Sequence, residues 1–299
     1  MRIGRYPVPA ALLTAVLAAG VLVGCGTAPA QPQWLPAPGA AGGRPATADP
    51  TGPSATADAA GSSPTPSASP SPSPSPTPSP TPTVPPDSAI PGSASGSFAA
   101  ADGAAGRIGI GARIVTYRVE VEQGIDWGGL EPWTVRRFAD RVDGILAASR
   151  GWTESGFHPV TDRSVGLNRA SWSFRRVGGN SYDVRIRLAT PQTVDRLCGQ
   201  VGLTTAGVFS CRFGTTIMIN LRRWLQGADG YPVTIDEYQT SVINHEIGHY
   251  LGFDHMGCAG QGRLAPVMGL QTTDLGGCRP NPYPFDEDGR FVSGPWQPS

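Results

Sequence analysis

The sequence predicts an α+β domain with a twisted mixed sheet, an active-site helix and an irregular C-terminal part, preceded by a disordered Pro/Ser/Thr-rich linker. Three observations support this. Apolar residues alternate with polar ones in several short segments and recur at helical spacing in others. The 31 prolines crowd into the first third of the 299 residues. Residues 107–299 are long enough for one hydrophobic core.

The first 25 residues resemble a bacterial lipoprotein signal peptide. Two arginines precede an apolar stretch over residues 10–23. This stretch is short for a bilayer span, which takes about 20 residues, and is typical of a signal peptide. It ends at Cys25 in a lipobox-like sequence, where the cysteine would be lipidated. The alternative is ordinary secretion with cleavage after Ala30. We therefore expect export, either to the outer face of the cell membrane through this lipid anchor alone or into the medium.

Residues 26–106 are expected to form a disordered linker. They are mainly Pro, Ser, Thr, Ala and Gly, and residues 62–86 are nearly pure Ser/Thr-Pro repeats. Little apolar surface can be buried there to offset the entropy of ordering the chain. Alternating prolines favour extended polyproline II, so a stalk is favoured over a Pro-rich ligand for a recognition module.

The first half of the folded part contains three predicted strands and a helix. Apolar and charged residues alternate over 117–122, which predicts a half-buried strand. Helical spacing of apolar residues predicts a helix over 132–149. Alternation predicts strands over 172–177 and 182–188, and the Gly-Gly-Asn sequence between them predicts a hairpin.

The second half begins with a short helix predicted over 191–198. Two strand-like segments, 207–212 and 215–221, are joined tightly at Gly214. The last helix is expected to begin at the capping box of Thr234 and Glu237 and to end at Gly252. Residues 256–299 are rich in Gly, Pro and Asn without a period, which predicts an irregular tail.

That last helix and the turn after it contain three of the 4 histidines in the chain. His245 and His249 are four residues apart and therefore lie on the same face of the helix. Gly252 allows the chain to reverse, so that His255 can become a third ligand. Three nitrogen ligands with one position left for water are typical of catalytic zinc. We expect one catalytic Zn²⁺ at these three residues.

Glu246, which follows the first histidine, is expected to be the general base and acid. Zinc lowers the pKa of bound water from about 15.7 toward 7, and the glutamate of this motif takes its proton. The competing interpretations are a structural zinc site, which usually has four protein ligands, and a helix that binds no metal. Five fixed positions in H-E-x-x-H-x-x-G-x-x-H make a chance match rare.

At these residues the sequence resembles the metzincin metallopeptidases, whose motif is followed by a Met-turn. The Ala-Pro-Val-Met-Gly sequence supplies Met268 as the candidate for that turn. In metzincins this methionine forms an apolar floor beneath the metal site. No tyrosine lies two residues after Met268, so we expect no tyrosine as a fifth ligand.

Several further segments are similar to an actinobacterial family catalogued as domain of unknown function 3152 and grouped with the zinc-dependent peptidases. The resemblance implies a metzincin-like zinc peptidase domain over residues 107–299 and supplies no substrate. The segments that carry it are 117–122, 244–246, 257–258, 266–268 and 277–282.

Disulfides are expected because an exported chain has an even number of cysteines in its folded part. Of the 5 cysteines, Cys25 belongs to the lipobox, which leaves four. Four cysteines allow three pairings. We prefer the nearest neighbours, Cys198–Cys211 and Cys258–Cys278, of which the second would enclose Met268.

The predicted function is that of an extracytoplasmic zinc-dependent metalloendopeptidase, expected to be a monomer acting on a peptide or protein. The 23 basic and 23 acidic residues balance, which gives no reason to expect nucleic acid as a partner. An extended substrate is expected to pair with an edge strand over residues 215–221. The alternatives are a cell-wall amide hydrolase using the same site, and a non-catalytic zinc-containing binding module on a surface stalk.

Overall fold

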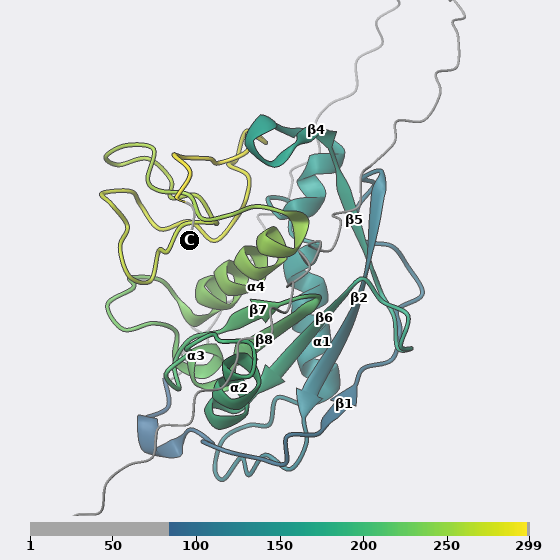
Figure 1. The fold of residues 1–299 in the computed structure, drawn as a ribbon, viewed down its shortest axis with the longest axis vertical. Coiled ribbons are helices and arrows are strands. Elements are labelled where there is room, and N and C mark those ends of the chain that lie inside the picture. The colour runs from purple at the N-terminus through teal and green to yellow at the C-terminus, as the bar shows by residue number, and fades with distance from the viewer. Residues whose placement is uncertain (1–83, 298–299) are drawn as a thin grey trace, which may run out of the picture. The chain divides into compact units, whose positions relative to one another are not determined.

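The computed structural model describes residues 84–297 as an α+β domain (Figure 1). The proposed signal peptide with Cys25 and most of the proposed linker lie outside the described residues. The strands are β1 (Phe98–Ala100), β2 (Arg113–Glu122), β3 (Val160–Asp162), β4 (Leu167–Ala170), β5 (Trp172–Arg176), β6 (Val184–Ala189), β7 (Cys211–Phe213) and β8 (Thr216–Asn220). The α-helices are α1 (Val135–Leu146), α2 (Pro191–Gly199), α3 (Leu221–Gln226) and α4 (Ile235–Leu251).

A mixed six-stranded sheet forms the centre of this domain. Its order is β1-β2-β6-β8-β7, with β5 pairing onto β2 as well. The pairs of β2 with β5, β2 with β6, and β6 with β8 are parallel, whereas β1 and β7 are antiparallel to their neighbours. β3 and β4 form a separate two-stranded sheet. The predicted α+β class and mixed sheet are therefore confirmed.

The predicted hairpin around the Gly-Gly-Asn sequence is wrong. β5 and β6 lie on opposite sides of β2, because Tyr117 of β2 is the register partner of both Arg176 and Val184. The chain thus crosses from one side of β2 to the other between β5 and β6. Turn-forming residues indicate where a strand stops, but they do not determine which neighbour the next strand joins.

The expected start of the folded part near Arg107 is too late. β1 pairs with β2 through Phe98 and Glu122, and the Gly96 amide donates to the Glu122 carboxylate over 2.8 Å. β1 has only three residues, two of them alanine, so it has no detectable alternation. The part of the expected linker from residue 84 to 106 therefore belongs to the described domain.

The expected edge strand also needs correction. The segment predicted over 215–221 is β8, which lies between β6 and β7 and has neighbours on both sides. β7 is the strand at that end of the sheet. The tight turn at Gly214 is confirmed: Gly214 has φ 52° and joins the two antiparallel strands. Alternation predicts a strand but does not give its place in the sheet.

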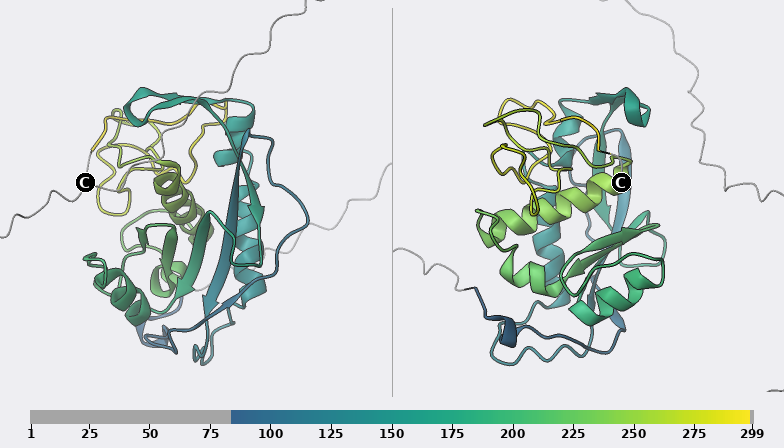
Figure 2. Two further views of the ribbon diagram at one scale, coloured as in Figure 1. Left: turned by 45° about the vertical axis from the view of Figure 1, so that its right-hand side comes forward. Right: turned by 60° about the vertical axis from the view of Figure 1, so that its left-hand side comes forward.

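The main core lies on one face of the sheet, beneath α1 and α4. Tyr117 and Val119 of β2 are fully buried there against Phe138 of α1 and Ile247 of α4. α2 covers the opposite face, where Val194 and Cys198 pack against Met218 of β8. The irregular C-terminal segment, drawn in yellow, lies beside α4 at the end of the domain that carries β3 and β4 (Figure 2).

The two expected disulfides are present. Cys198–Cys211 joins α2 to the edge strand β7, and Cys258–Cys278 closes a loop that contains Met268. Two disulfides suggest an oxidising compartment outside the cytoplasm. Within residues 84–297, none of the helices combines the length and apolar character needed to cross a membrane.

Candidate metal centre

Local signals fix both ends of α4, the helix that carries the histidines. The Thr234 hydroxyl accepts from the Glu237 amide over 3.2 Å, and the Glu237 carboxylate accepts from the Thr234 amide over 2.9 Å. This is the predicted capping box. At the other end Gly252 adopts the left-handed conformation at φ 107°, and the Phe253 amide donates to the Gly248 carbonyl over 3.0 Å. The chain therefore leaves α4 and folds back toward the histidines.

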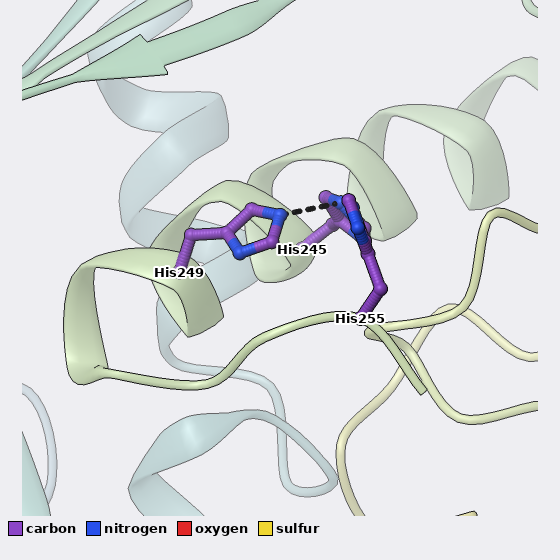
Figure 3. Close-up of side chains that lie close together, drawn as sticks. All are labelled: His245, His249 and His255. Carbon is purple, nitrogen blue, oxygen red and sulfur yellow. Dashed lines mark hydrogen bonds between the residues drawn. The ribbon is translucent and has the colours of Figure 1, made fainter. Parts of the chain in front are cut away.

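The three predicted histidines meet at one point (Figure 3). His245 and His249 project from α4, and His255 approaches from the loop that follows Gly252. One nitrogen atom from each lies within 4.8 Å of the others. The Nε2 atoms of His245 and His249 are 3.0 Å apart. This cluster could hold a metal ion.

Two backbone carbonyls determine which ring nitrogens face the centre. The Val267 carbonyl lies 2.8 Å from Nδ1 of His245, and the Phe253 carbonyl lies 2.9 Å from Nδ1 of His249. A carbonyl accepts only, so each Nδ1 carries the proton and donates it. Each Nε2 then presents a lone pair. Two lone pairs 3.0 Å apart repel each other unless a cation or a proton lies between them.

The histidines are held in the neutral form that coordinates metal. Burial, with a smaller contribution from the neighbouring histidines, lowers the pKa of His245 to about 3 and that of His249 to about 4. Burial also lowers the pKa of His255, against the opposing charge of Asp254. A metal ion therefore competes with few protons at these nitrogens at neutral pH.

Glu246 lies in the same cavity as the three histidines. The residue is buried, with 7% of its surface exposed. Burial raises the pKa of Glu246 to about 7, while the charge of Arg212 opposes this rise. A carboxylate with a pKa near neutrality can both accept and return a proton under physiological conditions.

Met268 lies against α4 between its two histidines. A Cβ atom added at Gly248 would lie 2.2 Å from Sδ of Met268 and 2.8 Å from the Trp152 ring. Only glycine therefore admits this methionine so close to the helix. The Met256 amide donates to the Met268 carbonyl over 3.1 Å, which ties the segment after His255 to the methionine loop.

The irregular tail is held in place by a buried amide network that sequence reasoning missed. The Gln271 side chain accepts from the Asn281 amide and donates to the Pro266 and Asn281 carbonyls. Asn244 of α4 donates to the Pro282 carbonyl over 3.0 Å. Asn244 thus joins α4 to the irregular tail. Single amides in an aperiodic segment give no pattern from which such roles could be predicted.

A cavity of about 720 Å³ opens over the centre. It is lined by the three histidines and Glu246, and also by Arg212 of β7 and Arg223 of α3, which sequence reasoning did not identify. Every basic residue in this lysine-free chain is arginine, so an individual arginine carries no signal. Asp254 also lines the cavity, and its carboxylate accepts a hydrogen bond from the His255 amide over 2.8 Å.

One comparison with known proteins gives a match. A family model described as "Protein of unknown function (DUF3152)" matches residues 84–289. Its first residue is also the first that the structure describes, which supports the earlier domain start. No curated protein and no solved structure matches the chain.

Proposed function

This chain belongs to the DUF3152 family of proteins of unknown function, and we propose that it is a zinc-dependent metalloendopeptidase. One observation carries the proposal: three neutral histidines converge beside a buried glutamate with a pKa of about 7, all in one cavity. A purely structural site would have no use for an unpaired acid beside its ligands. The metzincin-like order of the same residues in the sequence supports the same proposal.

The donor set fits zinc. Two ligands of a tetrahedral zinc ion, each bonded at about 2.0–2.1 Å, lie roughly 3.3–3.4 Å apart. The 3.0 Å between the Nε2 atoms of His245 and His249 is close to that separation. Three histidines also leave the fourth position open, as in catalytic zinc sites. His245, His249 and His255 would hold the ion, and zinc when bound supplies Lewis acidity toward water and a substrate carbonyl.

The residues of the chain then have separate tasks. The Val267 and Phe253 carbonyls keep the ligand rings oriented with Nε2 toward the cavity. The Glu246 carboxylate accepts a proton from the attacking water and later delivers it to the leaving amine. Met268 supports the site from beneath α4, as the Met-turn does in metzincins. Burial around Glu246 keeps its proton affinity matched to this exchange.

We propose that an extended substrate pairs with β7, replacing the earlier expectation for β8. β7 ends the sheet, and Cys211 and Arg212 of this strand line the cavity. A peptide can add to such an edge as a further strand, which presents its backbone to the metal centre. The Cys198–Cys211 disulfide anchors this edge to α2.

Two further proposals concern where the protein acts and how it is anchored. We propose that the enzyme acts outside the cytoplasm as a monomer, anchored through Cys25 or secreted, and the two disulfides support an oxidising environment. Cys25 lies outside the described residues. Mass spectrometry of the protein from its native membrane tests the anchor by the added mass of a lipid on an N-terminal Cys25.

Replacement of the proposed general base tests the enzymatic function. We expect Glu246→Gln to retain zinc but to lose at least about 100-fold in kcat on peptide substrates, since positioned acid–base catalysis contributes on the order of 10²–10⁴. Asp254→Asn is the matched control, because it neutralises another carboxylate of the same cavity. Unchanged hydrolysis by zinc-loaded Glu246→Gln would rule out the proposed role.

A further inference from the structure

Two arginines line the cavity of the metal centre from different elements. Arg212 belongs to the edge strand β7 and Arg223 to α3. Both are partly exposed. The cavity is therefore lined by two arginine residues on the side where β7 and α3 contact α4. The described mechanism uses neither of them.

Within the described part of the chain, no carboxylate pairs with either arginine. Arg212 donates to the Gly214 carbonyl over 2.7 Å, and Arg223 donates to the Gly227 carbonyl over 3.0 Å. Among residues 84–297 neither guanidinium forms an ion pair. The neighbouring Arg222 differs, since it pairs with Asp87 over 2.6 Å and is not among the residues that line the cavity. Each guanidinium has five N–H donors, so most remain available to a ligand.

The positive charges of the two arginines affect the pKa values of residues that line the cavity. Arg212 opposes the burial that raises the pKa of Glu246, and it also lowers the pKa of His249. Arg223 opposes the burial that raises the pKa of Tyr238, which lines the same cavity. Arg212 thus lies near the residues proposed to react, and Arg223 lies beside a neighbouring part of the wall.

The rest of the cavity wall is partly apolar. Leu203, Phe209 and Leu270 line it and are 40%, 45% and 48% exposed. The Arg223 guanidinium lies 5.8 Å from the centre of the Phe209 ring, within the range of a cation–π contact. Apolar side chains around unpaired cations favour an occupant that is both apolar and anionic.

We propose that the cavity selects substrates carrying a carboxylate close to the bond to be cleaved, and that Arg212 and Arg223 bind this carboxylate. Guanidinium groups pair with carboxylates through two parallel hydrogen bonds. An occupant that covers the arginines without supplying an anion would leave them desolvated and unpaired. The carboxylate is either an Asp or Glu side chain or the free C-terminus of the substrate. This inference rests on the proposed function, because it takes from it that a peptide bond of the substrate is cleaved. The preference for a carboxylate can be measured by binding alone, without cleavage.

Peptide binding to the full, zinc-loaded chain carrying Glu246→Gln tests the proposal without turnover. The probes are two pairs of labelled apolar peptides. The members of the first pair differ only in an internal Glu or Gln, and those of the second pair differ only in a free or amidated C-terminus. In one of these pairs we expect the Kd of the acidic peptide to be at least about tenfold lower than that of the neutral peptide, because a carboxylate forms charge-assisted hydrogen bonds with a guanidinium group. The pair that shows the difference identifies the source of the carboxylate. Equal affinities within both pairs overturn the proposal without any further variant.

Variants assign the preference to the two arginines. In the double variant with Arg212→Gln and Arg223→Gln, the ratio of the Kd values of the neutral and acidic peptides should fall to about one. The control variant Arg222→Gln, which lies beside Arg223 on α3, should leave this ratio unchanged. Arg223→Glu should instead favour a peptide with Lys over its Gln counterpart, which loss of structure would not produce. Measurements of zinc content and circular dichroism show whether each variant still binds zinc and keeps its secondary structure. An acid preference that persists in the double variant contradicts the assignment.

The outcomes also separate this inference from the peptidase proposal. An acid preference in a protein that, with Glu246 intact, hydrolyses no peptide would sustain the recognition site and refute the peptidase function. Zinc-dependent hydrolysis with equal affinity for acidic and neutral peptides would support the peptidase function and refute the carboxylate recognition site.

Discussion

Among single residues, those that contact the histidines determine what the centre can bind. The Val267 and Phe253 carbonyls orient two rings, and burial keeps all three histidines neutral. Gly248 leaves room for Met268 under the helix. None of these contacts supplies a metal ligand, but each restricts where a ligand nitrogen can lie.

The stability of the metal-free protein should fall as the pH drops from 6.5 toward 4. The pKa of His245 is lowered from 6.5 to about 3 and that of His249 to about 4, so the unfolded chain binds protons that the folded chain does not. Their contribution is present above 6.5 and is lost in acid. The raised pKa of Glu246, about 7, acts with the opposite sign, but two histidines outweigh one glutamate.

Urea unfolding with a chelator at several pH values measures this dependence. The expected slope is on the order of 1 kcal/mol per pH unit for each net proton. Glu246→Gln should make it steeper, and His249→Gln should make it shallower. If His249→Gln leaves the slope unchanged, the histidine is not buried in its neutral form.

Gly248→Ala should destabilise the protein and weaken zinc binding, although alanine is the better helix former. The new methyl group would meet Met268 and Trp152, and Trp152 is held by its hydrogen bond to the Asn244 carbonyl. Overpacking typically costs about 1–3 kcal/mol, against a propensity gain of about 1 kcal/mol. Gly144→Ala in α1 is the control, because nothing lies within 4 Å of its added Cβ, and it should stabilise. Equal stabilities of the two variants would contradict the close packing of Met268.

At the scale of the elements, local sequence predicts helices and turns more completely than strand neighbours. The capping box at Thr234, the end of α4 at Gly252 and the turn at Gly214 depend on nearby residues and are confirmed. The position of β8 and the crossing between β5 and β6 depend on residues far apart in the chain. Alternation also predicts an exposed face for β2, yet Glu120 and Glu122 are buried on it.

Glu120 is buried because arginines from two strands surround it. Arg118 and Arg187 lie 2.6 Å and 2.5 Å from its carboxylate, and Arg185 lies 4.0 Å away. Glu120→Gln removes the anion from this cluster and should cost about 3–5 kcal/mol in the free energy of unfolding, as for other broken buried pairs.

The control for this change is an exposed ion pair. Asp140→Asn breaks the pair with Arg136 on α1, whose two side chains are 60% and 91% exposed, and should cost under about 0.5 kcal/mol. Urea unfolding compares the two variants. A cost for Glu120→Gln no larger than that for Asp140→Asn would show that the arginines do not depend on this carboxylate.

For the described domain as a whole, the cluster of three histidines could be predicted from the sequence because they lie within eleven residues of one helix and its turn. The cavity around them could not. Its wall combines β7, α3, α4 and the tail, and the two arginines become neighbours of the site only through the order of the sheet and the path of the chain. The tail is aperiodic, and its disulfide and amide network hold Met268 in place.

The zinc content of the full chain, purified without a histidine tag, tests the central claim most directly. We predict about one zinc per chain for the wild type, since three histidines form one open tetrahedral site. His249→Ala should remain folded and retain little zinc. A folded wild-type protein that binds no zinc when the metal is supplied, or a His249→Ala variant that binds it equally well, would contradict the account.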